Sequence, residues 1–310
     1  MKDVVRPPAL LAGDTIGVVA PASNLKRDWF AAGVRELERL GFKVKYLDSI
    51  FEKGRFTAGS DRRRADEVNR MFADTEVKAI FAARGGYGSA RILELLDNET
   101  ISANPKIFMG YSDITTLLIF LYQKHNLVTF HGPMVAKDFR AGESHYDRYL
   151  LFRVLTRAEA AGEVNCAGTK ILRSGVASGR LLGGCLPMIT NSIGTEYELD
   201  TRGAILFIED YDSKPYRIDR MLTHLRLAGK FNEVRGLIFG EMIDCIQHPD
   251  QGYTIDEVIE DCVGDLGIPV LFGLTAGHGE LNNLTLPLGV EVTLDCERGK
   301  LTINEPAVVF

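Results

Sequence analysis

Strand-like and helix-like segments alternate along the first half of the chain, and this alternation limits the folds that the chain can adopt. Short β-branched and apolar runs predict strands within 15–23, 42–48, 77–86, 106–110 and 127–133. Segments with helical spacing lie between them, at 28–41, 61–74, 88–97 and 114–126. Strands separated by helices predict a doubly wound, mostly parallel sheet with helices on both faces. Such sheets bind ligands at the carboxyl ends of their strands.

The second half of the chain has a different composition. The stretch 162–184 is rich in Gly and Ser, contains short strand-like pieces and is typical of a connection into a second domain. Further strands are predicted at 203–212, 234–242 and 269–279, with a helix at 215–229 and a hairpin within 289–306 that turns at Arg298 and Gly299. We therefore predict an α/β protein with an N-terminal α/β domain in 1–160 and a β-rich, mixed C-terminal domain in 161–310.

The overall composition excludes several classes of function. Of the 310 residues, 45% are hydrophobic and 25% are charged, which is typical of a globular protein with a sizeable core. The net charge of -6 argues against a nucleic-acid partner, because such proteins usually carry a basic face. We find no signal-peptide pattern and no apolar run long enough to cross a membrane. These features predict a cytoplasmic protein without a membrane partner.

The cysteines argue against a metal centre. Five of them are spread along the chain, and none forms a CxxC pair. This spacing is typical of reduced thiols in a cytosolic protein and not of a zinc site. We expect neither a metal nor a cofactor.

Ser112 follows an apolar run in the segment KIFMGYSDITTLL, and two interpretations of it compete. The first is a nucleophile elbow, in which a strand enters a tight turn, the serine lies at its tip and a helix begins behind it. The pattern Gly110-x-Ser112-x-Ile114 lacks the final glycine of the usual G-x-S-x-G motif. The second is an ordinary helix N-cap, with Asp113 favoured in the first turn by the helix dipole. These residues alone favour the cap.

The segment RGGYGS, residues 84–89, also joins a predicted strand to a predicted helix. Adjacent glycines let the backbone approach a ligand, so that its N–H groups can hold an oxyanion or a carboxylate. The dinucleotide pattern G-x-G-x-x-G fails, because Arg91 occupies its last position. The alternative is an ordinary tight turn. Arg84 is either a partner for a carboxylate in the site or part of a structural salt bridge.

A serine nucleophile needs a base, and six histidines are available. Only His131 and His278 follow apolar strands and lie next to glycine. For each of them taken alone, a hydrogen-bonded structural role is the favoured interpretation. Glu209 and Asp210 end another apolar strand, where a buried acid requires a partner, so either is a candidate to orient the imidazole. The alternative for both acids is an exposed loop position.

Together these segments resemble the LD-carboxypeptidase family of serine peptidases, which includes murein tetrapeptide carboxypeptidases and microcin C self-immunity proteins. The matching elements, which span nearly the whole chain in order, are GDTIGVVAPAS, RGGYGSARIL, MGYSDITTLL, FHGPM, LLGG, LFIEDYD, YRIDRMLTHL and GHGELNNLTLPLG. The resemblance implies a nucleophile at Ser112, an orienting acid at Glu209 and a base at His278. The chain departs from the family at Cys185, where asparagine is common.

The resemblance also implies a site at the interface of the two domains. Backbone N–H groups near Gly86 and Asp113 would form the oxyanion hole. The candidate substrate-binding residues are Arg84, Gly85, Tyr111 and His131, the last as a site-wall or structural residue. Family members are typically dimers, so a homodimer is expected.

Three functions remain open at this point. The first is cleavage of the amide between the L-centre of meso-diaminopimelate and terminal D-alanine in murein tetrapeptides, during cell-wall recycling. The second keeps the same three residues but hydrolyses peptidyl or aminoacyl adenylate analogues, and would favour an aromatic side chain that stacks on the base. The single tryptophan, Trp29, lies in an early helix, and no obvious stacking loop is present. The third is a non-catalytic α/β protein that binds a small anion through RGGYG.

Overall fold

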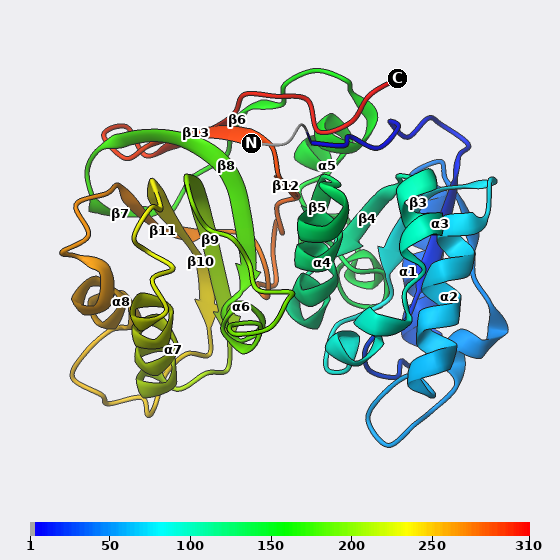
Figure 1. Ribbon diagram of the computed structural model, residues 1–310, viewed down its shortest axis with the longest axis horizontal. Helices are drawn as coiled ribbons and strands as arrows, with labels where there is room; N and C mark the ends of the chain where they lie inside the picture. Colours follow the sequence, from blue (N-terminus) through cyan, green and yellow to red (C-terminus); the bar gives the residue numbers. More distant parts are fainter. Residues whose placement is uncertain (1–3) are drawn as a thin grey trace.

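The computed structural model describes residues 4–310 and contains two β-sheets (Figure 1). The strand order of the first sheet is β12-β5-β4-β3-β1-β2. All its pairs are parallel except β5 with β12. Its strands are β1 (Thr15–Val19), β2 (Lys43–Lys45), β3 (Val77–Ala82), β4 (Ile107–Gly110), β5 (Thr129–His131) and β12 (Leu286–Leu288). The central strands are buried on both faces, as expected for a parallel sheet covered by helices.

The helices of this half follow from the spacing of its apolar residues. They are α1 (Arg27–Arg39), α2 (Asp61–Ala73), α3 (Asn98–Ala103), α4 (Thr115–His125) and α5 (Arg148–Thr156). In α1, Phe30, Gly33 and Leu37 share one face and are buried. Helix α2 begins where the Ser60 side chain accepts a hydrogen bond from Arg63 N.

The helix predicted at 88–97 is instead a short 3₁₀-helix, η2 (Ser89–Leu95). The chain enters it from Gly88 at φ +127°. It is followed at once by Asp97, whose side chain caps α3 by accepting hydrogen bonds from Glu99 N and Thr100 N. The segment therefore has room for only a few residues before the next helix begins.

The second sheet has the order β6-β14-β13-β8-β9-β10-β11-β7. Strands β8 to β11 pair in parallel, and the other pairs are antiparallel. Its strands are β6 (Gly162–Val164), β7 (Lys170–Arg173), β8 (Val176–Cys185), β9 (Ala204–Tyr211), β10 (Gly236–Ile243), β11 (Val270–Leu274), β13 (Glu291–Asp295) and β14 (Lys300–Ile303). The helices of this half are α6 (Leu186–Asn191), α7 (Pro215–Leu227) and α8 (Ile255–Val263).

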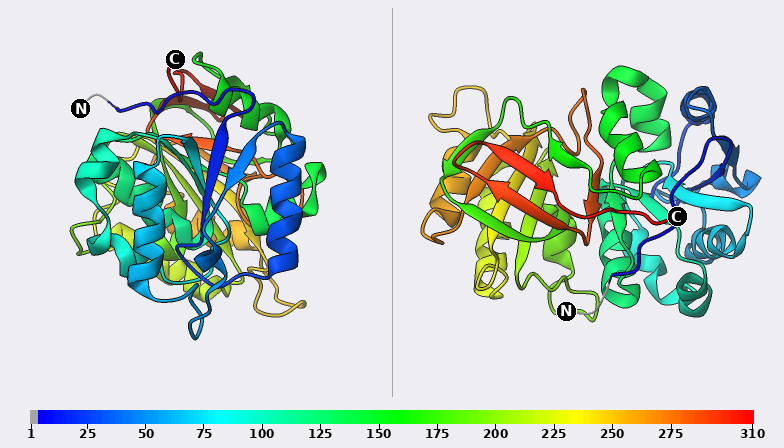
Figure 2. Two further views of the ribbon diagram at one scale, coloured as in Figure 1. Left: turned by 90° about the vertical axis from the view of Figure 1, so that its right-hand side faces the viewer. Right: turned by 90° about the horizontal axis from the view of Figure 1, so that it is seen from above.

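The predicted fold class is confirmed, and the second half contributes chain segments to the first. Strand β12 comes from the second half but pairs with β5 of the first sheet. The C-terminal segment also returns to the first half, where Val309 forms a bridge with Pro8 (Figure 2). The domain boundary between residues 160 and 161 stays a prediction. Within residues 4–310, no helix combines the length and the apolar character that a membrane span needs.

Candidate active site

Ser112 lies immediately beyond β4, in the turn that leads into α4. Its backbone has φ +62°, a left-handed conformation that is costly for a residue with a side chain. Tyr111 occupies the N-cap position of this turn, and Ile114 occupies that of α4. Neither position has a side-chain hydrogen bond that caps the helix. The N-cap interpretation of Ser112 is therefore wrong. A strained residue at a strand-to-helix turn is instead typical of a nucleophile elbow.

Glycines let neighbouring backbone approach this turn closely. A Cβ on Gly85 would lie 2.8 Å from Ser112 Cβ, and one on Gly110 would lie 2.9 Å from a methyl carbon of Ile114. Gly86 has φ +112°, and a Cβ there would lie 2.4 Å from Ser23 Oγ. Gly85 is therefore required for close contact with the Ser112 turn and Gly86 for close contact with Ser23, which an ordinary surface turn does not require.

Buried side chains hold the RGGYG segment in place. The fully buried guanidinium of Arg64 donates hydrogen bonds to the carbonyl oxygens of Pro21 and Gly88, the latter at 2.8 Å. The carboxylate of Asp113 accepts a hydrogen bond from Ser89 N at 2.8 Å. Asp113 thus joins the Ser112 turn to the end of the glycine segment.

His278 contacts Glu209 across the second sheet. Its Nδ1 lies 2.7 Å from Glu209 Oε2, and the Glu209 side chain on β9 is completely buried. Burial opposes ionisation of Glu209, but the charge and hydrogen bond of His278 outweigh it and hold the pKa of the carboxyl below its ordinary value. A Cβ on Gly277 would lie 2.5 Å from Glu209 Oε2, so only glycine admits this approach. Glu209 is therefore not an exposed loop acid.

Two tyrosines surround the His278 ring. Tyr211 stacks on it with ring centroids 5.1 Å apart, and Tyr111 meets it edge-on at the same separation. The imidazole therefore has one nitrogen on a buried carboxylate, one stacked aromatic neighbour and one aromatic neighbour in a T-shaped contact. This arrangement fixes the orientation of the ring.

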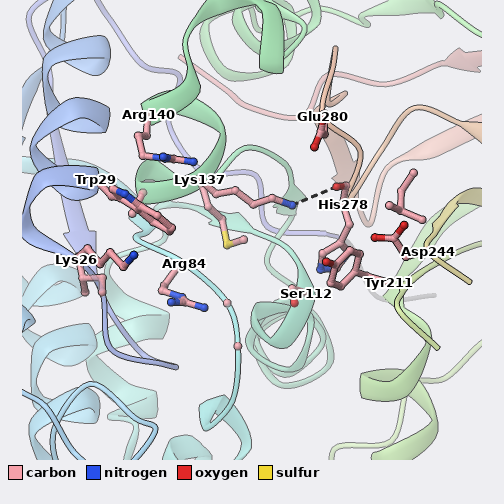
Figure 3. A pocket seen from close by; sticks show the side chains of 16 residues that line it. Lys26, Trp29, Arg84, Ser112, Lys137, Arg140, Tyr211, Asp244, His278 and Glu280 are labelled. Atoms are coloured by element: carbon pink, nitrogen blue, oxygen red, sulfur yellow. Dashed lines mark hydrogen bonds between the residues drawn. The ribbon is translucent and has the colours of Figure 1, made fainter.

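Ser112 and His278 line one cavity of about 550 Å³ (Figure 3). Arg84, Gly85 and Gly86 also line it, as the sequence predicted for a ligand site. Figure 3 shows Ser112 between two walls of different character. One wall carries cationic side chains from the first half, and the other carries acidic and aromatic side chains from the second half.

The cavity includes residues that sequence reasoning missed. The cationic wall contains Lys26, Trp29, Lys137 and Arg140 in addition to Arg84. The opposite wall contains Tyr211, Asp244 and Glu280. Trp29 was predicted only as part of an early helix, and nothing in its local pattern indicates that the start of α1 faces the Ser112 turn. An aromatic side chain therefore does line the site, but Lys26 and Arg140 lie on either side of its ring and leave no free surface for a stacked base.

Tyr111 and His131 lie behind the cavity wall and not in its lining. Both are fully buried, so the structure does not place them in contact with a bound substrate. The His131 ring contacts Tyr111 and Phe207, and neither of its nitrogens has a hydrogen-bond partner within the described residues. His131 is therefore a structural residue here, without the hydrogen bond that such a residue usually makes.

The burial of His131 predicts a pH-dependent stability. Burial lowers its pKa to about 4; Glu209 nearby raises it, and His278 lowers it further. As the pH falls below 6.5, the His131 side chain is protonated in the unfolded chain before it is protonated in the folded protein. The free energy of unfolding should therefore decrease between pH 6.5 and pH 4, by about 3 kcal/mol in total. Denaturant unfolding of the protein and of His131→Phe should show this loss only in the former. Parallel pH profiles would contradict the assignment.

A buried network connects the Ser112 turn to the His278 loop through Asp138. The Asp138 carboxylate accepts hydrogen bonds from Tyr111 OH at 3.2 Å, Met134 N at 2.8 Å and Asn283 Nδ2 at 3.4 Å. Asn283 in turn accepts one from Gly277 N at 3.0 Å, beside His278. Residues on both sides of the site thus depend on one carboxylate.

We expect Asp138→Ala to weaken both the fold and the site. It leaves buried donors without an acceptor, which costs about 2–4 kcal/mol of unfolding free energy. Movement of the serine turn relative to His278 should lower kcat by about 10–100-fold, with a smaller change in KM. Denaturant titration and steady-state kinetics measure the two effects. Asp138→Asn keeps one of the two acceptor oxygens and should lose less of both, and equal losses in the two variants would contradict the network.

The fold and the site define a two-sheet α/β protein with a serine, a histidine and a buried glutamate at one cavity. The model of the LD-carboxypeptidase N-terminal domain matches residues 16–132, and that of the LD-carboxypeptidase C-terminal domain matches residues 178–294. The chain belongs to the LD-carboxypeptidase family, a family of hydrolases, as the sequence predicted.

Individual relatives cover nearly the whole chain. A probable murein peptide carboxypeptidase of Bacillus subtilis is 36% identical over 94% of this chain and 91% of its own length. A solved microcin C7 self-immunity protein in complex with aspartyl sulfamoyl adenosine is 28% identical, with a TM-score of 0.90 over 98% of this chain and 100% of that one. A muramoyltetrapeptide carboxypeptidase from Oxalobacter formigenes is 28% identical, with a TM-score of 0.83 over 94% of this chain and 99% of that one.

Proposed function

We propose that the protein is a serine LD-carboxypeptidase that releases terminal D-alanine from murein tetrapeptides in cell-wall recycling. The observation that carries the proposal is the hydrogen bond of His278 to buried Glu209, in a cavity that Ser112 also lines. The names of two of the relatives above support a murein peptide substrate. The cytoplasmic location and the homodimer that the family resemblance implies are part of the same proposal.

In the proposed reaction, Ser112 Oγ attacks the carbonyl carbon of the amide before D-alanine. His278 takes the Ser112 proton through Nε2, because Nδ1 is held by Glu209. The carboxylate of Glu209 stabilises the imidazolium that forms, and its lowered pKa keeps it ionised at neutral pH. Backbone N–H groups of Gly86 and Asp113 stabilise the negative oxygen of the tetrahedral intermediate.

The intermediate collapses when the C–N bond breaks. The imidazolium of His278 gives its proton to the leaving nitrogen, and D-alanine departs with the electron pair of that bond. A water molecule then loses a proton to His278 and attacks the ester carbon of the acyl-enzyme. The second collapse returns the proton to Ser112 Oγ and frees the shortened peptide.

Arg84 is proposed to hold the terminal carboxylate of the substrate. It lines the cavity beside Gly85, which contacts the Ser112 turn. Within residues 4–310 its guanidinium has no acidic partner within 4.0 Å, and it donates a hydrogen bond to Asn24 O at 3.1 Å. The described residues therefore do not give Arg84 the structural salt bridge that the sequence left open. A carboxylate that binds a guanidinium without an acidic partner forms a strong, charge-assisted contact.

The direct test of this function is D-alanine release. The purified protein should release D-alanine from a diaminopimelate-containing tetrapeptide and should leave the corresponding tripeptide intact. An aminoacyl sulfamoyl adenosine provides the comparison, since the microcin relative binds such a ligand and Trp29 lines the cavity. Hydrolysis of adenylate analogues without D-alanine release would favour that second function. Hydrolysis of neither, with no acylation of Ser112, would favour the non-catalytic binding protein.

A further inference from the structure

The wall of the cavity formed by the first half is strongly cationic, although the chain as a whole is acidic. Lys26, Arg84, Lys137 and Arg140 all line it, in a protein whose net charge is -6. None of the four has an acidic side chain within 4.0 Å among residues 4–310, whereas many other Lys and Arg residues do. Like charges that gather without counter-charges repel one another. An anionic ligand would remove that cost.

Trp29 organises two of these cations. Lys26 Nζ and Arg140 Cζ each lie 4.2 Å from the centroid of its ring, and Figure 3 shows them on either side of the indole. Lys26 precedes α1, which begins at Arg27, and Arg140 follows the π-helical turn η4 (Val135–Phe139). Cation–π contacts hold both groups beside the cavity without neutralising them. Their charges therefore remain available to a ligand.

The opposite wall has the opposite charge. Asp244 and Glu280 line it, and neither has a cationic partner within 4.0 Å among the described residues. A carboxylate of a bound peptide is repelled from that wall and attracted to the wall around Trp29. The cavity therefore favours a substrate that carries its negative charges toward α1.

We propose that Lys26, Trp29 and Arg140 form a subsite for a second carboxylate of the substrate, separate from the terminal carboxylate at Arg84. The proposal rests on the proposed function, because a murein tetrapeptide carries carboxylates besides the terminal one. Two groups have this chemistry: the D-centre carboxylate of diaminopimelate and that of the glutamate that precedes it. The subsite selects peptides that carry the free acid over those that carry the amide.

The same geometry argues against a nucleobase at Trp29. Stacking needs a free face of the indole, but the two cations occupy both sides of the ring. A base would have to displace one of them and lose a cation–π contact. An anion instead binds to the cations where they already lie.

Binding measurements on a Ser112→Gly background test the subsite without turnover. Three tetrapeptides are titrated by calorimetry: one with all carboxylates free, one amidated at the D-centre of diaminopimelate and one amidated at the preceding glutamate. The test protein carries both Lys26→Ala and Arg140→Ala. The control protein carries both Lys43→Ala and Arg62→Ala, which replace two exposed cations that lie outside the cavity.

We expect the Lys26 and Arg140 replacements to weaken binding of the free-acid peptide about tenfold, as for two partly exposed charge contacts. The loss should shrink as salt concentration rises. One of the amidated peptides should bind about tenfold more weakly to the Ser112→Gly protein and should not respond to these replacements, which identifies the carboxylate. The controls should change nothing.

Three results would overturn the subsite. The first is an equal loss for all three peptides, and the second is no loss for any of them. The third is an effect of Lys26 and Arg140 only on binding of an aminoacyl sulfamoyl adenosine, which would assign the wall to a nucleotide. Each is distinct from failure of the proposed function, in which the unsubstituted protein releases no D-alanine from the free-acid tetrapeptide.

Discussion

Ser112→Gly should abolish peptide hydrolysis and leave the protein folded. Removal of the proposed nucleophile is expected to lower kcat/KM by about 10⁴-fold or more. Glycine accepts the left-handed backbone at φ +62° without strain. This relief offsets the stability of about 1 kcal/mol that a glycine usually costs because it makes the unfolded chain more flexible. Steady-state D-alanine release and thermal unfolding measure the two effects.

The companion variant Ser112→Ala separates chemistry from backbone strain. It also lacks the hydroxyl but keeps a Cβ in the left-handed conformation, so it should be as inactive as Ser112→Gly and no more stable. Activity in either variant within tenfold of the unsubstituted protein would remove Ser112 from the mechanism. A large fall in melting temperature in Ser112→Gly would contradict the strained-turn account of this position.

Glu209→Gln should produce the second large loss. The amide keeps the size of the side chain but not its charge, so it cannot stabilise the imidazolium of His278. It can also donate a hydrogen bond to Nδ1, which favours the wrong tautomer. By analogy with the aspartate of other serine hydrolase triads, kcat should fall by about 10²–10⁴-fold with little change in KM. Steady-state kinetics near neutral pH measure this loss.

Asp210→Asn is the matched control for Glu209→Gln. Asp210 is also buried, is next in sequence and has a pKa raised to about 6, chiefly by burial. Its carboxylate accepts a hydrogen bond from Tyr211 N at 2.7 Å and none from His278. We expect less than a tenfold loss. If the two variants lost the same activity, a general effect of buried charge would replace the specific role of Glu209.

The fold was predictable where local pattern and burial agree. Alternating apolar runs and helical spacing placed β1 to β5 and the helices α1, α2 and α4 close to their observed positions. It was not predictable that β12 joins the first sheet, because Leu286–Leu288 has no local feature that selects the first sheet over the second. The helix expected at 88–97 failed because the cap at Asp97 and the conformation of Gly88 limit its length.

The site was predictable for residues with a distinctive sequence context. Ser112, Glu209 and His278 each follow or end an apolar strand, and the order of their surrounding segments matched a family. Sequence did not show the positive φ of Ser112, because many residue types precede helices in ordinary conformations. It also missed Trp29 and Arg140, since their place in the cavity depends on how distant segments pack.

Covalent modification of Ser112 during turnover tests the central claim most directly. A depsipeptide in which D-lactate replaces D-alanine forms the acyl-enzyme through an easier leaving group, so the intermediate should accumulate. Rapid acid quench and peptide mass spectrometry then locate the acyl group. We predict a burst of about one D-lactate per site and an ester of the shortened peptide on Ser112. An acyl group on another residue, or undiminished depsipeptide turnover in Ser112→Gly, would contradict the claim.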